Sequence, residues 1–187
     1  MLTFIQKEDF LALQLQDPYY EGRGGYFAEA IDMVKRIPGV DEFQPSDVLE
    51  IGPYRLPIVP GCDVMDNMSH GLPVTHKHDA SETPWPIETG RYRLMIALQV
   101  WEHLGSKQRE AWQEARRVAD WAVVSVPYMW PESTGLDHAH IDLLTMDRWT
   151  RQKARLHQLI LSPLAPLYRL VCLYDLKAEQ RTDDACH

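Results

Sequence analysis

Two continuous apolar segments constrain the fold of this chain more than any other feature. One strand is predicted over residues 93–99, where positions 94–98 are all apolar, and another over residues 121–126. A strand that is apolar on both faces must be covered on both sides, which is typical of central strands in a parallel sheet flanked by helices. Between the two strands, Ser106 is predicted to cap a helix. One side of that helix repeats apolar residues at helical spacing: Ala111, Trp112, Ala115, Val118 and Ala119. The chain is therefore predicted to be an α/β protein.

Shorter patterns complete the predicted fold. Helices are predicted over residues 8–16 and 26–37, and strands over 47–51, 62–65 and 73–78. A short helix is expected after Thr145 with Asp147 in its first turn, and strands over 155–161 and 168–176 would end the chain as an antiparallel hairpin. We expect an N-terminal helical segment (1–44), an α/β domain (45–177) and a tail (178–187).

Charge and composition exclude several classes of function. The chain has 187 residues, enough for one domain with a sizeable core, and a formal net charge of -8. That charge argues against binding to nucleic acid or to anionic membranes. The start of the chain lacks the basic and apolar regions of a signal peptide, and no apolar run is long enough to span a bilayer. Cys62, Cys172 and Cys186 show no metal-like spacing, so we expect a reduced, cytoplasmic protein.

Polar residues follow several of the predicted strands, and ligands bind outside the carboxyl ends of parallel strands. Asp66 follows the second strand, where a carboxylate can bind both hydroxyls of a ribose; Asp63 takes this place if the register differs. Asp79 follows the third strand and can accept from an adenine amino group, or can simply form a turn. Gly52 follows the first strand and lets a ligand approach the backbone closely.

The chain resembles the class I S-adenosyl-L-methionine (SAM)-dependent methyltransferases of small-molecule type, over about residues 45–176. Five segments are similar to that family's motifs in order and spacing: Val48 to Pro53, Asp66, His78 to Ala80 with Thr83 to Trp85, Leu94 to Leu104, and Asp137 to His140 with Leu144 and Thr145. The resemblance implies a three-layer Rossmann-like sandwich with a mostly parallel central sheet. It also implies SAM as the cofactor, held by Glu50, Gly52, Pro53, Tyr54, Asp66, Asp79, Ala80, Gln99 and Val100.

One segment departs from the family pattern. Gly52 is followed by a loop in which Pro57 and Pro60 would break any helix, and the usual further glycines are absent. We therefore expect an extended loop in place of the helix after the first strand. In the family, the N-terminus of that helix offers free backbone donors to the methionine part of SAM.

Two histidines are candidates for catalysis. His103 lies just past the fourth strand, where an acceptor oxygen would approach the sulfonium, and His138 is a candidate substrate contact; either could take the proton of the acceptor. His138 and His140 would face the same way on an extended segment, as two metal ligands do. The sequence shows no third ligand for them, so no metal site is predicted.

The main hypothesis is a SAM-dependent methyltransferase that acts on a small-molecule hydroxyl or amine by direct methyl transfer. An alternative is a catalytically degenerate protein of the same fold that serves as a binding or assembly module, and a third is a metal-dependent enzyme built on His138 and His140. One local feature also has two interpretations. Residues 17–26 combine glycines and tyrosines, either as a flap over the ligand or as a turn with packed rings. Glu114 and Arg117 are expected to pair on a solvated helix face.

Overall fold

The computed structural model describes residues 1–163 and 167–178, and in them a seven-stranded sheet has the order β3-β2-β1-β4-β5-β7-β6. The strands are β1 (Val48–Ile51), β2 (Asp63–Asp66), β3 (His76–Lys77), β4 (Leu94–Leu98), β5 (Trp121–Tyr128), β6 (Leu156–Leu161) and β7 (Tyr168–Asp175). The first five are parallel, and β7 pairs antiparallel with both β5 and β6. The expected mostly parallel sheet with a C-terminal hairpin is confirmed. Cys186, most of the predicted tail and residues 164–166 of the hairpin turn lie outside the described residues.

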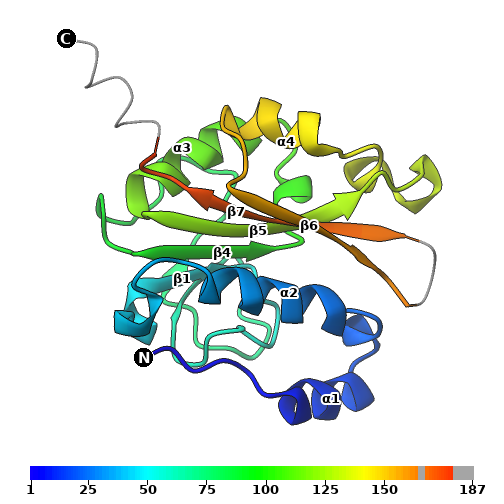
Figure 1. Cartoon of the computed structure of the whole chain (residues 1–187), viewed down its shortest axis with the longest axis horizontal. Coiled ribbons are helices and arrows are strands. Elements are labelled where there is room, and N and C mark those ends of the chain that lie inside the picture. Colours follow the sequence, from blue (N-terminus) through cyan, green and yellow to red (C-terminus); the bar gives the residue numbers. More distant parts are fainter. Residues whose placement is uncertain (164–166, 179–187) are drawn as a thin grey trace.

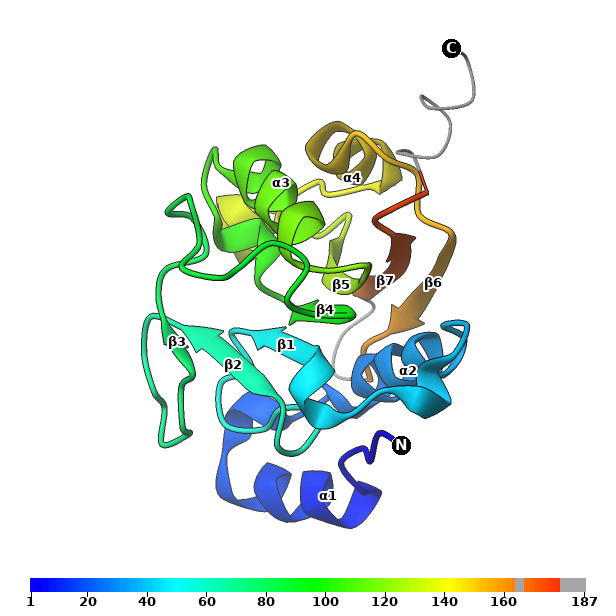
Figure 2. The same cartoon turned by 90° about the vertical axis from the view of Figure 1, so that its left-hand side faces the viewer.

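Helices cover both faces of the sheet, which gives the expected three layers. They are α1 (Lys7–Gln16), α2 (Gly24–Lys35), α3 (Gln108–Val118) and α4 (Leu143–Thr150). Short 3₁₀ turns span Pro18–Tyr20, Val40–Glu42, Pro45–Asp47, Trp101–His103, Glu132–Thr134 and Leu136–His138. In Figure 1, α3 and α4 lie above the sheet and α1 and α2 below it. Figure 2 shows the same layers with the strands from β3 to β6 in spatial order.

Each face of the sheet carries its own apolar cluster. The cluster under α3 and α4 includes Trp112 and Met146, and the cluster on the α2 side includes Phe27. Every residue of β4 is buried, as its apolar sequence predicted. The strand order reverses between β1 and β4, which is the place where open α/β sheets bind ligands. The N-terminal segment packs into the cluster on the α2 side, and its boundary at residue 44 stays a prediction.

The loop between β1 and β2 contains no helix, as its prolines predicted. Its residues Ile58 and Val59 are 0% exposed and pack into the cluster on the α2 side. The buried carboxylate of Glu50 accepts the backbone N–H of Ile58, at 2.9 Å to Oε2 and 3.1 Å to Oε1. Two apolar side chains and one buried carboxyl group therefore fix the loop where the family has a helix.

Two expectations about helix starts were wrong. Lys107, not Ser106, is the N-cap of α3, and it makes no side-chain capping hydrogen bond. The helix α4 begins at Leu143, because Asp142 Oδ1 accepts the N–H of Thr145 at 2.7 Å, so Asp147 lies beyond the first turn.

The pair Glu114–Arg117 is not a solvated surface pair. Glu114 Oε2 accepts from the N–H of Trp85 at 2.6 Å, and Arg117 donates to the carbonyl of Ile87 at 2.6 Å. The ion pair therefore holds the segment before β4 against α3. Among the described residues, none of the helices has the length and apolar character needed to cross a membrane.

Candidate functional site

The turn after β1 touches the segment that follows β4. Gly52 has φ +60°, and a Cβ built on it would lie 2.9 Å from Cγ2 of Val100. The N–H of Gly52 donates to the carbonyl of Met65 on β2 at 3.0 Å. A residue with a side chain would therefore be strained in its backbone and would collide with Val100. The carboxyl ends of three neighbouring strands meet at this glycine.

The register of β2 separates the two candidate ribose ligands. Asp66 ends the strand at the carboxyl edge, is half-buried, and accepts the N–H of Met68 on Oδ1 at 2.9 Å. Asp63 begins the strand, at its amino end, and its carboxylate accepts the hydroxyl of Tyr92 at 2.9 Å. The alternative that Asp63 occupies the ribose position is therefore wrong.

Asp79 forms a turn and also joins two strand ends. Its Oδ1 accepts both the N–H of Ser81 at 2.8 Å and the Ser81 hydroxyl at 2.7 Å, and these hydrogen bonds lower the pKa of Asp79. Its Oδ2 accepts from Asn67 at 3.2 Å. Ala80 is buried, and its carbonyl accepts the indole N–H of Trp85 at 3.0 Å. Both oxygens of Asp79 therefore already have partners inside the protein.

Aromatic rings extend the site from the turn at Gly52 to the N-terminal segment. Tyr54, which follows Pro53, has φ +59° and packs against Tyr19 and His70 in tilted ring contacts, with centroids 4.4 and 4.7 Å apart. The guanidinium of Arg23 lies 3.8 Å from the centroid of the Tyr19 ring. A chain of contacts therefore leads from the strand edge to Arg23.

The glycine- and tyrosine-rich segment 17–26 packs tyrosines into the core, and its role as a flap over a ligand stays a prediction. Tyr20 and Tyr26 are 0% and 2% exposed and belong to the core, as the packing interpretation predicts. Tyr19 is 36% exposed and covers Tyr54, so it is placed to contact a ligand at the turn. The contact between Tyr19 and Tyr54 had no signal in the sequence, because the two residues are far apart along the chain.

Gln99 fixes a buried arginine next to the end of β4. It has φ +58°, donates to the hydroxyl of Ser125 at 3.2 Å, and accepts from Nε of Arg169 at 3.2 Å. Arg169 is 7% exposed, and its guanidinium lies 5.1 Å from the ring of Trp130. Within residues 1–163 and 167–178, no ion pair forms at Arg23 or Arg169. The site therefore holds two cations that no carboxylate within the described chain neutralises by direct contact.

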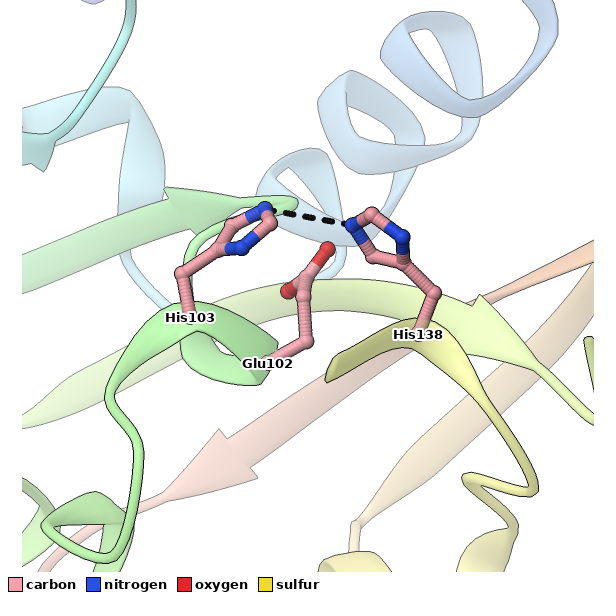
Figure 3. A group of neighbouring side chains, drawn as sticks. All are labelled: Glu102, His103 and His138. Carbon is pink, nitrogen blue, oxygen red and sulfur yellow. Dashed lines mark hydrogen bonds between the residues drawn. The ribbon is translucent and has the colours of Figure 1, made fainter. Parts of the chain in front are cut away.

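Glu102, His103 and His138 lie together at the same edge (Figure 3). The two imidazoles approach through their Nε2 atoms at 3.4 Å, with ring centroids 4.9 Å apart and planes nearly perpendicular. Nδ1 of His138 lies 3.0 Å from the carbonyl of Thr134, so Nδ1 carries the proton and donates it. In this tautomer Nε2 of His138 carries a lone pair, which accepts the N–H of His103.

Burial shifts the pKa values in this group. Glu102 is 3% exposed, and burial raises its pKa to about 8. Partial burial, followed by the charge of His138, lowers the pKa of His103. The sequence suggested His103 and His138 separately, and the structure brings them together. Glu102 was not among the predicted site residues, because its neighbours in the fold come from distant segments.

His140 does not join His138 in one site, so the alternative of a metal enzyme built on these two histidines is wrong. His140 has φ +58°, and its Nε2 lies 3.6 Å from a carboxylate oxygen of Glu132. Its backbone N–H donates to the carbonyl of Trp130 at 3.0 Å. The bridge between Trp130 and Ala139 is isolated, and the 3₁₀ turn Leu136–His138 ends the extended geometry that the pairing required.

Solved structures with a similar arrangement of elements include methyltransferases. No protein-family model and no curated protein matches the sequence. The trans-methyltransferase CalH in complex with SAH matches 69% of this chain at 14% identity and a TM-score of 0.53, and this chain spans only 51% of CalH. The match to the N-methyltransferase NodS from Bradyrhizobium japonicum WM9 covers 81% of this chain and 94% of the NodS chain, at 13% identity and a TM-score of 0.57.

The match to a SAM-dependent methyltransferase from Thermotoga maritima covers 81% of this chain and 89% of the Thermotoga chain, at 11% identity and a TM-score of 0.55. At identities this low, the likeness shows the fold alone. The chain therefore has the Rossmann-like fold of class I SAM-dependent methyltransferases, as its motifs predicted.

Proposed function

We propose that this protein is a SAM-dependent methyltransferase that acts on a small-molecule hydroxyl or amine. One observation carries the proposal: the motif residues, which are far apart in sequence, gather where β1 and β4 diverge. Gly52 contacts Val100 there, and the turn is joined to the end of β2, which Asp66 completes. This is the position at which open α/β sheets bind nucleotides.

The adenosine half of SAM fits the residues at this edge. Oδ1 of Asp66 accepts from Met68, and among the described residues Oδ2 has no hydrogen-bond partner, so a ribose hydroxyl can donate to it. The rings of Tyr54 and His70, 4.7 Å apart between centroids and inclined by 57° to each other, provide aromatic contacts for the adenosine beside the turn. Oδ2 of Asp79 accepts one hydrogen bond, from Asn67, and keeps a second lone pair that can accept from the adenine amino group.

The methionine half needs a different partner here, because the usual helix N-terminus is absent. The backbone donors of the loop already have acceptors. The N–H of Arg55 donates to the Tyr20 hydroxyl at 3.1 Å, and the N–H of Leu56 donates to the carbonyl of Pro53 at 3.3 Å. The N–H of Ile58 is bound to Glu50. Arg23 carries a full positive charge, where a helix N-terminus offers about half of one. We assign to Arg23 the binding of the methionine carboxylate.

The chemistry requires little from the protein beyond positioning. Bound SAM supplies an electrophilic methyl group, which the acceptor displaces directly. The chain aligns the acceptor and excludes water, which accounts for most of the acceleration in such reactions. The pair His103 and His138, 3.4 Å apart, receives the proton that the acceptor releases.

Calorimetric titration with SAM and with S-adenosylhomocysteine tests the cofactor. We expect micromolar affinity, and a loss of about tenfold or more in Asp66→Ala, because a ribose hydroxyl then lacks its charged acceptor. Asp63→Ala is the matched control. It removes the aspartate at the amino end of the same strand and should leave the SAM affinity unchanged. Absence of binding at millimolar ligand would refute the proposal.

A second candidate function is that of a catalytically degenerate binding or assembly module. The missing helix and the occupied backbone donors of residues 53–61 favour it. The burial of Ile58 and Val59 argues against a partner surface on this loop, because these two apolar side chains are fully buried and cannot contact a partner. A module of this kind predicts no SAM binding and a partner surface over the loop.

A further inference from the structure

The cluster Glu102, His103 and His138 has the composition of a metal site. One ligand atom from each residue can be chosen so that all three atoms lie within 4.8 Å of one another. Figure 3 shows the carboxylate of Glu102 directed between the two imidazoles. Two residues come from the turn after β4 and the third from the turn Leu136–His138, so the fold assembles the group from two segments.

The distances suit a small divalent cation. Two ligands of a tetrahedral ion with bonds of about 2.1 Å lie roughly 3.4 Å apart, and the two Nε2 atoms are separated by 3.4 Å. The carboxylate oxygen of Glu102 lies within 4.8 Å of a ring nitrogen of each histidine. The hydrogen bond from Nδ1 of His138 to Thr134 is of the kind that orients a metal-binding imidazole and leaves Nε2 free.

Glu102 supplies an independent indication that points to a ligand. Its side chain is buried, and within the described residues its Oε2 atom has no hydrogen-bond partner. Leaving a carboxylate oxygen buried without a partner is costly, and a bound cation would remove that cost. Arg169 and Arg23 act on Glu102 electrostatically, but among the described residues no ion pair to either is formed.

We propose that Glu102, His103 and His138 bind one divalent transition-metal cation, such as Zn²⁺, Co²⁺ or Mn²⁺, with a coordination position open to solvent. Two imidazole nitrogens and one carboxylate oxygen are a set that these ions accept. The sequence offered no third ligand for His138, because the missing carboxylate lies 36 residues earlier in the chain, next to His103.

The role of the cation follows only if the proposed function holds. The open position would bind the oxygen of a hydroxyl acceptor and lower its pKa. Because both imidazoles are then bound to the ion, the hydroxyl proton would pass to water, and the two histidines would receive it only in the metal-free protein. The oxygen lone pair would form the bond to the methyl carbon while the carbon–sulfur bond breaks. The metal therefore favours a hydroxyl acceptor over an amine.

Titration with Co²⁺ alone tests the site on the full-length, untagged protein after chelator treatment. We expect one equivalent per chain, measured by calorimetry, and a visible absorption band from coordinated Co²⁺. His138→Ala and Glu102→Gln should each weaken binding by about tenfold or more. His140→Ala is the matched control, since His140 pairs with Glu132 outside the cluster, and it should bind Co²⁺ as the wild type does.

Two outcomes would overturn the proposal. One is the absence of saturable Co²⁺ binding by the wild type. The other is a loss in His140→Ala equal to that in His138→Ala, which would mean binding elsewhere in the 137–142 segment. Because Glu102 is buried, circular dichroism and thermal unfolding must show that Glu102→Gln is folded. His103→Ala, at an exposed position, provides a second variant that should also lose Co²⁺.

The test separates this site from the cofactor site. Asp66→Ala should lose SAM and retain Co²⁺, and His138→Ala should lose Co²⁺ and retain SAM. Binding of Co²⁺ without SAM would support the metal site and refute the proposed function. Binding of SAM with no saturable Co²⁺ binding would support the proposed function and overturn the metal site.

Discussion

A Cβ atom on Gly52 would lie 2.9 Å from Cγ2 of Val100. The turn after β1 and the segment after β4 are therefore as close as a glycine allows, at the point where the strand order reverses. The contact fixes the floor of the candidate cofactor site. It also makes the site sensitive to one methyl group, because a Cβ contact of this length cannot be accommodated without movement.

Gly52→Ala should lower the free energy of unfolding by about 3 kcal/mol. The left-handed backbone accounts for about 1–2 kcal/mol of this loss and the collision with Val100 for the remainder. Urea unfolding of the two proteins measures the difference. The same variant should weaken SAM binding, since the turn must move away from Val100.

Gly61→Ala is the control for backbone strain alone. Gly61 has φ +80°, but the nearest atom to its added Cβ is Cβ of Pro45 at an ordinary 3.8 Å. It should lose only about 1–2 kcal/mol. Combining Gly52→Ala with Val100→Ala should recover part of the larger loss. Equal losses in Gly52→Ala and Gly61→Ala would show that the contact with Val100 contributes nothing.

Glu50→Gln should remove a pH dependence of stability. Burial raises the pKa of Glu50 to about 8 from 4.5, so between these values the folded protein binds a proton that the unfolded chain releases. The stabilising contribution is complete below pH 4.5 and is lost as the pH rises through about 8. The wild type should lose up to about 1.4 kcal/mol per pH unit in this window.

Gln keeps an acceptor for the N–H of Ile58 and has no charge to desolvate, so Glu50→Gln should gain stability relative to the wild type as the pH rises from 5 to 8. Denaturant unfolding at several pH values measures the two slopes. Glu88→Gln, at an exposed glutamate, is the control and should follow the wild type. Parallel curves for the wild type and Glu50→Gln would contradict the prediction.

Much of the fold follows from the sequence because its signals are local. The apolar segment 94–98 is a fully buried strand, and Pro57 and Pro60 exclude a helix between β1 and β2. The candidate site is less accessible to such reasoning. Asp66 could be placed because it ends a strand, whereas Tyr19, Arg23 and Glu102 depend on contacts between distant segments.

The pair Glu114 and Arg117 shows why helical spacing alone is insufficient. Their separation predicts an ion pair, which is present at 2.6 Å. It does not reveal that the backbone of Trp85 and Ile87 lies against the same two side chains. The irregular segment between β3 and β4 has no periodic pattern, so its path over α3 could not be derived from the residues.

Glu114→Gln should therefore destabilise the protein by about 1–2 kcal/mol at pH 7, since charged hydrogen bonds are lost and solvent screens part of them. The hydrogen bond from Arg117, followed by that from Trp85, lowers the pKa of Glu114. Its contribution is complete above 4.5 and is lost as the pH falls through the lower folded-state value. Thermal unfolding should show the difference from wild type shrinking in acid. Glu110→Gln, on the exposed face of α3, should have little effect.

The position of the cofactor can be measured directly by amide NMR of the ¹⁵N-labelled protein titrated with S-adenosylhomocysteine. Our proposal predicts shifts at Gly52, Tyr54, Asp66 and Val100, with smaller changes around Asp79 and Ala80. Shifts confined to the apolar cavity of about 800 Å³ beside α1 and α2, which Phe10, Phe27 and Ile31 line, would place the ligand elsewhere and contradict the proposal.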